Sequence, residues 1–134
     1  LYNPDQKAKF HTPIKYVQAK GKMFHGSPRP EGIPKGEIHE CFSNATQLLW
    51  EHEDWKYAEG FAMREGLLPV LHAWCVTPDG KVVDNTWDET EHSAYFGVVY
   101  DRGQYLKHLY KAKFYGVLGG NEKQAVKVLQ KGGL

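Results

Sequence analysis

Three residues of the types used in nucleophilic catalysis are spread along this sequence: Cys41, His72 and Asp84. Cys41 lies where a helix is expected to begin, and the positive end of a helix dipole favours a thiolate over a thiol. A thiolate nucleophile needs a base or imidazolium beside it, and that histidine needs a carboxylate or amide to fix its tautomer. Taken in chain order, the three residues predict a nucleophile, a general base and an orienting acid.

The elements that must position these residues follow from hydrophobic spacing. Apolar residues recur at helical intervals over 41–52, which predicts a helix that begins at Cys41. Alternation predicts strands at 55–63, 70–76, 81–87 and 95–100, with a last short strand at 113–118. Further helices are predicted over 101–111 and from an Asn121 cap to just before Gly132. Together these elements predict an α+β domain with an antiparallel sheet.

The segment 55–63 also allows a second interpretation, as a continuation of the preceding helix. As a strand, it would place three small residues on one face: Ala58, Gly60 and Ala62. A face of small residues would let a helix pack closely against that strand. Periodicity alone leaves the choice between strand and helix open.

The turn between the second and third predicted strands decides whether His72 and Asp84 can meet. Pro78 suits the second position of a type I turn, and Gly80 can take the left-handed conformation, so a three-residue loop with a bulge is favoured. In that register His72 and Asp84 are diagonal neighbours on one face. A two-residue loop would instead pair Cys75 with Asp84 and turn His72 to the other face. Pro78 favours the first register.

These residues carry a resemblance to a known family. A cysteine at a helix start, the strand motif His72-Ala73-Trp74 and the following Val83-Asp84-Asn85-Thr86-Trp87 are similar to the core of the transglutaminase-like branch of the papain-like cysteine superfamily. The resemblance covers about residues 38–87 and extends, through small size and a Pro-rich arm, to short phage-encoded members. It implies an N-terminal catalytic helix packed on a small antiparallel sheet. It also implies Cys41 as nucleophile, His72 as base and Asp84 as the orienting residue.

The sequence departs from the family pattern close to the nucleophile. His39 and Glu40 precede Cys41, where the family often has tryptophan or glycine. Related peptidases use an upstream glutamine as an oxyanion donor, and no glutamine lies between Gln18 and Gln47. The backbone N–H of Cys41 can supply one hydrogen bond, which leaves the second donor unassigned. Asn85 also follows Asp84 where the family commonly has proline.

Four further residues are candidates for substrate contact: Asn44, Tyr57, Glu59 and Trp74. Asn44 follows Cys41 by three residues, so both can share a helical face that lines a cleft. Tyr57 and Glu59 share one face of the first predicted strand. A structural hydrogen bond for Asn44 and core packing for Trp74 are the competing interpretations.

A zinc domain is a rival to the catalytic interpretation because His39, Cys41, His72 and Cys75 are suitable ligand types. Along a strand, however, Cys75 faces away from His72, so Cys75 is predicted to be structural and no metal or cofactor is predicted. A third possibility is a catalytically silent papain-like module that binds or inhibits a protein or small-molecule partner.

Composition limits the remaining classes. The 134 residues fit one domain, and 41% hydrophobic residues are enough to fill its core. The 17 basic and 16 acidic residues nearly balance, which argues against nucleic-acid binding, and the basic residues of 107–113 are interpreted as a solvated helix face. No apolar run is long enough to span a membrane. A peptide, protein or small amide substrate is therefore the expected partner.

Two cysteines are too few for a disulfide scaffold, and no signal-peptide pattern opens the chain, so a cytoplasmic protein is expected. Five of the seven prolines lie within the first 34 residues. Residues 1–36 are therefore predicted to form a Pro-rich arm with one short strand at 14–18. Residues 37–134 are predicted to form the single papain-like α+β domain.

Overall fold

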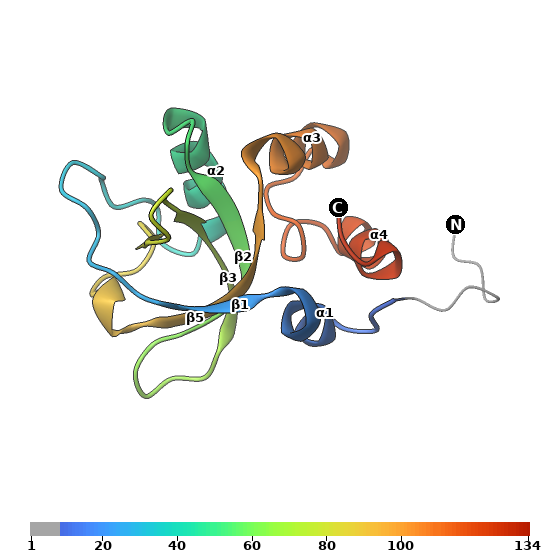
Figure 1. Cartoon of the computed structure of the whole chain (residues 1–134), viewed down its shortest axis with the longest axis horizontal. Helices are drawn as coiled ribbons and strands as arrows, with labels where there is room; N and C mark the ends of the chain where they lie inside the picture. Colours follow the sequence, from blue (N-terminus) through green and yellow to red (C-terminus); the bar gives the residue numbers. More distant parts are fainter. Residues whose placement is uncertain (1–8) are drawn as a thin grey trace.

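A computed structural model of the chain describes residues 9–134, in which four α-helices surround a five-stranded antiparallel sheet (Figure 1). The helices are α1 (Pro13–Lys20), α2 (Cys41–Glu51), α3 (Arg102–Ala112) and α4 (Glu122–Lys131), with a short 3-10 helix η1 (Thr90–His92). The strands are β1 (Lys22–His25), β2 (Lys56–Met63), β3 (Val70–Val76), β4 (Val82–Val83) and β5 (Ala94–Tyr100). Their order in the sheet is β1-β5-β2-β3-β4.

The predicted α+β class and its antiparallel sheet are confirmed. Strand β2 lies at the centre, because Tyr57 pairs with Cys75 of β3 on one side and with Tyr100 of β5 on the other. The segment 55–63 is therefore a strand, not a continued helix. Helix α2 begins at Cys41 as predicted, and Asn121 caps α4 by accepting the N–H of Gln124 at 3.1 Å.

The two faces of β2 pack against different partners. Tyr57 on one face belongs to the larger core, together with apolar residues of all four helices. Ala58 and Ala62 on the other face pack in a smaller cluster around Trp74. Helix α2 therefore packs against the face opposite to the one predicted. A Cβ at Gly60 would lie 2.2 Å from the carbonyl oxygen of Phe96, so this small residue accommodates the neighbouring strand and not a helix.

The N-terminal region forms regular structure at both of the places described next. The predicted strand at 14–18 is wrong, because these residues belong to α1. Thr12 caps this helix by accepting the N–H of Lys15 at 3.1 Å, and Pro13 occupies its first turn. The strand of this region is β1, which pairs with β5 along one edge of the sheet.

Two other predicted strands differ from the structure. Segment 81–87 pairs as a strand only at Val82 and Val83, because the N–H of Thr86 turns back to the carboxylate of Asp84. Segment 113–118 forms no strand, because its N–H groups are taken by side chains from the core. Among residues 9–134, every helix is too short or too polar to cross a membrane.

Candidate active site

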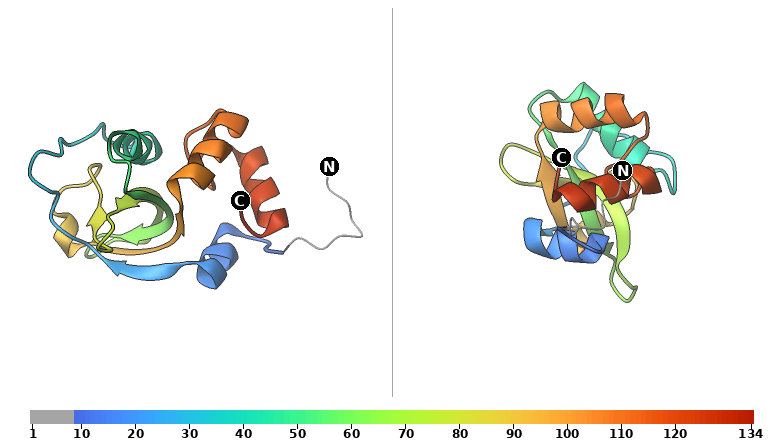
Figure 2. Two further views of the ribbon diagram at one scale, coloured as in Figure 1. Left: turned by 45° about the horizontal axis from the view of Figure 1, so that its top comes forward. Right: turned by 90° about the vertical axis from the view of Figure 1, so that its right-hand side faces the viewer.

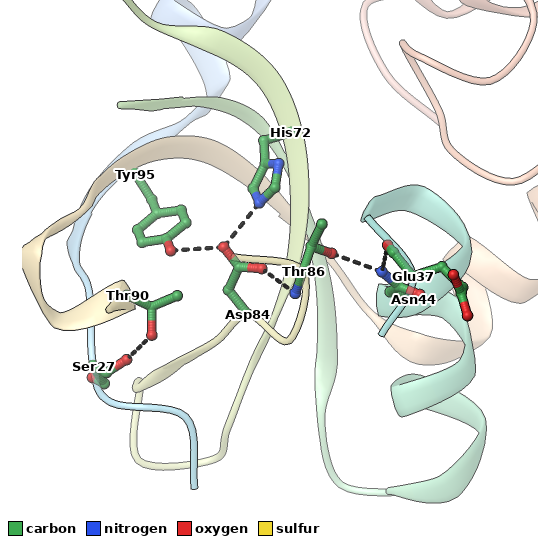
Figure 3. Close-up of polar contacts among 8 residues, drawn as sticks. All are labelled: Ser27, Glu37, Asn44, His72, Asp84, Thr86, Thr90 and Tyr95. Atoms are coloured by element: carbon green, nitrogen blue, oxygen red, sulfur yellow. Dashed lines mark hydrogen bonds and ion pairs between the residues drawn. The ribbon is translucent and has the colours of Figure 1, made fainter. Parts of the chain in front are cut away.

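The β3–β4 hairpin has the register that its turn residues predict. Cys75 pairs with Val83, the N–H of Thr77 donates to the carbonyl of Lys81 at 2.9 Å, and Gly80 has a φ of 83°. Three residues thus form the loop, with glycine in the left-handed position. The outcome is a direct contact, in which Nε2 of His72 lies 2.8 Å from Oδ2 of Asp84 (Figure 3).

The carboxylate of Asp84 is buried and held by two further donors. The hydroxyl of Tyr95 on β5 donates to Oδ2 at 2.8 Å, and the backbone N–H of Thr86 donates to Oδ1 at 2.9 Å (Figure 3). Hydrogen bonds to both oxygens fix the orientation of a carboxylate and offset part of its desolvation. Sequence reasoning missed Tyr95, because its role depends on which strand lies beside β2.

Cys41 is the first residue of α2 and is 7% exposed. Glu40 before it makes no side-chain hydrogen bond to the helix N-terminus, so no side chain covers the N–H groups of the first turn. The thiol lies within hydrogen-bonding range of His72, where it contributes to the pKa of the imidazole. Because Asp84 occupies Nε2, the other ring nitrogen, Nδ1, is left for the thiol.

Burial by itself lowers the pKa of His72, which is 2% exposed. Hydrogen bonding to Asp84 and to Cys41, together with the charge of Asp84, outweighs burial and raises the pKa from 6.5 to about 9. At pH 7 the imidazole is therefore protonated. A protonated imidazole beside a cysteine is an arrangement that favours the thiolate form.

Aromatic rings hold the plane of the His72 imidazole. Trp87 stacks on it with ring centroids 4.0 Å apart and an angle of 23° between the planes. The guanidinium of Arg64 lies 4.6 Å from the centre of the Trp87 ring. This layered contact covers His72 and restricts its rotation, as stacked rings do in protein cores.

Asn44 lies one turn after Cys41 and is almost fully buried. Its amide nitrogen donates to the carbonyl of Glu37 at 2.8 Å and to Oγ1 of Thr86 at 2.9 Å (Figure 3). Asn44 thus ties α2 to the segment that follows Asp84, which is a structural role near the site.

A polar groove of about 370 Å³ lies between α2 and the segment 34–37. Its lining includes Glu37, Glu40, Ser43, Asn44, Gln47 and Asn85. Asn44 therefore lines a groove, as predicted, but neither Cys41 nor His72 is part of this lining. The groove begins one residue before the nucleophile candidate, at Glu40.

The other predicted substrate contacts lie away from the groove. Tyr57 and Glu59 are fully buried on the opposite face of the sheet, where the carboxylate of Glu59 accepts the N–H groups of Val117 at 2.7 Å and Gly119 at 2.9 Å. Burial raises the pKa of Glu59, although these hydrogen bonds lower it in part. Trp74 is also fully buried, so in this structure none of the three can contact a substrate.

The zinc interpretation gains no support from the geometry. Among residues 9–134, no three histidine, cysteine or acidic side chains are grouped as metal ligands. Cys75 points into the core, where its thiol donates to the carbonyl of Ala45 at 3.2 Å. Burial raises the pKa of this thiol, as expected for an inert structural cysteine.

No family model matches the sequence, and comparisons with characterised proteins and with solved structures find no similar chain. The structure establishes an α+β domain with an antiparallel sheet. The similarity to the transglutaminase-like branch rests on the motif around Cys41, His72 and Asp84 alone.

Proposed function

We propose that this chain is a cysteine-dependent hydrolase or acyltransferase of the papain-like, transglutaminase-like type. One observation carries the proposal: a buried His72–Asp84 pair lies 2.8 Å apart, and the thiol at the start of α2 acts on the same imidazole. Nucleophile, base and orienting carboxylate in contact are what acyl transfer through a thioester requires.

In the proposed reaction, the Cys41 sulfur attacks the carbonyl carbon of an amide, isopeptide or ester. The thiol proton resides on His72 and is transferred to the leaving amine or alcohol as the C–N or C–O bond breaks. Water or an amine then attacks the thioester, and its proton returns through His72. The N–H of Cys41 is a donor to the oxyanion, in the first turn of a helix with no side-chain cap.

The groups around Asp84 act indirectly in this scheme. Asp84 keeps the proton-bearing Nε2 of His72 pointed away from the nucleophile, so that Nδ1 faces the thiol. Tyr95 and the N–H of Thr86 keep the carboxylate in place. Trp87, stacked on the imidazole, limits the rotation that would break this alignment.

A binding function is the second candidate, and limited access to the thiol favours it. Cys41 and His72 are 7% and 2% exposed, and the groove beside α2 includes neither residue. A papain-like module without turnover would use that groove to hold a protein or small-molecule partner. Turnover requires Trp87 or the segment 34–37 to move and expose the sulfur.

The first test is alkylation of the two cysteines by iodoacetamide, with the modified site assigned by mass spectrometry. We expect Cys41 to react faster than Cys75, which serves as an internal control because it is buried in the core. The pH profile of the Cys41 rate should change in His72→Ala. A Cys41 rate that is indifferent to His72 would favour the binding module.

The second test is turnover on a panel of amide, isopeptide and ester substrates. Cys41→Ala and His72→Ala should abolish turnover while circular dichroism shows a retained fold, and Asp84→Ala should weaken it less. Full activity of Cys41→Ala on an identified substrate would refute the mechanism.

A further inference from the structure

The near-zero net charge of the chain conceals an uneven distribution. Residues 102–134 contain seven of the 17 lysines and arginines but only one of the 16 acidic residues, Glu122. In the structure this part of the chain forms α3, α4 and the segments beside them. Both helices lie together at one end of the molecule (Figures 1 and 2). Positive charge is therefore concentrated at that end.

The lysines of α3 and α4 point away from the core. On α3, Lys107 and Lys111 are exposed and one turn apart, whereas the buried face consists of Tyr105, Leu109 and Ala112. On α4, exposed lysines occur at every fourth position: Lys123, Lys127 and Lys131. Each helix thus presents a row of ammonium groups to solvent.

The two rows meet near His108. Burial lowers the pKa of His108, and the charges of Lys111 on α3 and Lys131 on α4 lower it further, so both ammonium groups lie close enough to act on one imidazole. The Nε2 atom of His108 is buried and has no hydrogen-bond partner among residues 9–134. The two helices therefore form one continuous positive surface.

This charge is not neutralised within the molecule. The ion pairs formed by lysines among residues 9–134 involve Lys35, Lys56 and Lys81, and none includes a basic residue of 102–134. A helix pair with unpaired like charges is destabilised by repulsion, which an anionic partner would relieve.

Exposed aromatic side chains gather at the same end. Among residues 9–134, the large exposed aromatic residues are Trp50, Tyr110, Phe114 and Tyr115. Tyr110, which is 69% exposed, lies between Lys107 and Lys111 on the outer face of α3. Tyr115 packs edge-to-face against Trp50 at the end of α2, with ring centroids 6.3 Å apart. All the large exposed aromatic surface of the described chain is thus next to its unpaired lysines.

We propose that this basic–aromatic surface, formed by the lysines of α3 and α4 with Tyr110 and Phe114, binds single-stranded nucleic acid. Lysines contact the phosphates, and the aromatic rings stack with the bases, which is how sequence-tolerant single-strand binding works. The overall charge balance argued against a nucleic acid, but binding depends on where the charge lies and not on its sum.

Two other anionic partners fit less well. In a duplex the base faces are stacked inside, so Tyr110 and Phe114 would have nothing to stack on. A membrane surface is bound by a helix whose apolar face is turned outward. Here the apolar faces of α3 and α4 are buried, at Leu109 and Val128 for example.

Fluorescence anisotropy with a labelled oligothymidine of about 20 nucleotides, longer than one binding site, tests the proposal. Binding should weaken steeply as salt increases. The double variant K107Q/K111Q should bind less tightly, and its salt slope should fall by about 2, one for each lost phosphate contact. The matched control K22Q/K81Q removes two exposed lysines elsewhere, on β1 and in the β3–β4 turn, and should bind as the wild type does.

The aromatic contribution has its own test. Tyr110→Ala should weaken binding about tenfold, whereas Tyr110→Phe retains the ring and should keep the affinity. The proposal is overturned if the oligothymidine does not bind at low salt, or if Tyr110→Ala leaves its affinity unchanged. Binding to phosphatidylserine vesicles in the absence of oligonucleotide binding would also overturn it. Cys41→Ala should bind the oligonucleotide normally, so this result is independent of the proposed catalytic function.

Discussion

Replacing Asp84 with asparagine should lower the pKa of His72 towards or below its ordinary value. In the wild type, the rise from 6.5 to about 9 is equivalent to about 3.4 kcal/mol in favour of the imidazolium, at 1.36 kcal/mol per pH unit. Asp84 contributes to this rise through both a hydrogen bond and its charge. Asparagine keeps an acceptor oxygen but removes the charge, so burial then dominates.

The same quantity predicts a dependence of stability on pH. A histidine with a raised pKa stabilises the folded state fully below pH 6.5, and this contribution is lost as the pH rises through about 9. The free energy of unfolding should therefore fall by up to about 3 kcal/mol over this range. Cys75 acts in the same direction at the alkaline end, because burial raises its pKa. Asp84→Asn should lose the His72 part of the dependence and keep the Cys75 part.

Two measurements follow. The imidazole resonances of His72 can be recorded by NMR from about pH 5 to about pH 10, in the wild type and in Asp84→Asn, with the exposed histidines as internal controls. Urea unfolding over the same range gives the stability. The reasoning is refuted if wild-type His72 titrates at or below 6.5, or if Asp84→Asn leaves its titration unchanged.

Three further predictions concern packing and support. Glu59→Ala should lower the free energy of unfolding by at least about 3 kcal/mol in urea titrations, because it leaves several buried N–H groups without an acceptor; a loss below about 1 kcal/mol would contradict this role. Gly60→Ala should destabilise by more than about 2 kcal/mol through a backbone clash, whereas Gly103→Ala, with open space on a helix, should stabilise by about 0.5–1 kcal/mol; equal effects on thermal unfolding would rule out the clash. Tyr95→Phe should lower the unfolding free energy by about 1–3 kcal/mol and raise the NMR pKa of His72, since the carboxylate then has one competing donor fewer; an unchanged His72 titration would show that this bond does not tune the pair.

The parts of the site that depend on local geometry could be predicted from the sequence. Pro78 and Gly80 define the turn, the turn defines the register, and the register brings His72 to Asp84. Alternation and helical spacing likewise located β2, β3, β5 and α2, because each has one face in the core.

The parts that depend on distant segments could not. Tyr95 supports Asp84 only because β5 pairs with β2, and nothing near Tyr95 in the sequence encodes that neighbour. The apolar residues of 113–118 suggested a strand, but Glu59 binds their N–H groups and so prevents pairing. The strand predicted at 14–18 overlooked the Thr12-Pro13 pair, which is a helix-start signal.

The hydrogen bonds of Glu59 to residues 117–119 also limit how this protein can be divided. They join the connection between α3 and α4 to the central strand, in the interior of the sheet. A chain shortened before Val117 would leave a carboxylate stranded in an apolar interior with no amide to solvate it. The C-terminal helices are therefore not a detachable module. Any shorter derivative of the protein must keep them or replace Glu59 with an apolar residue.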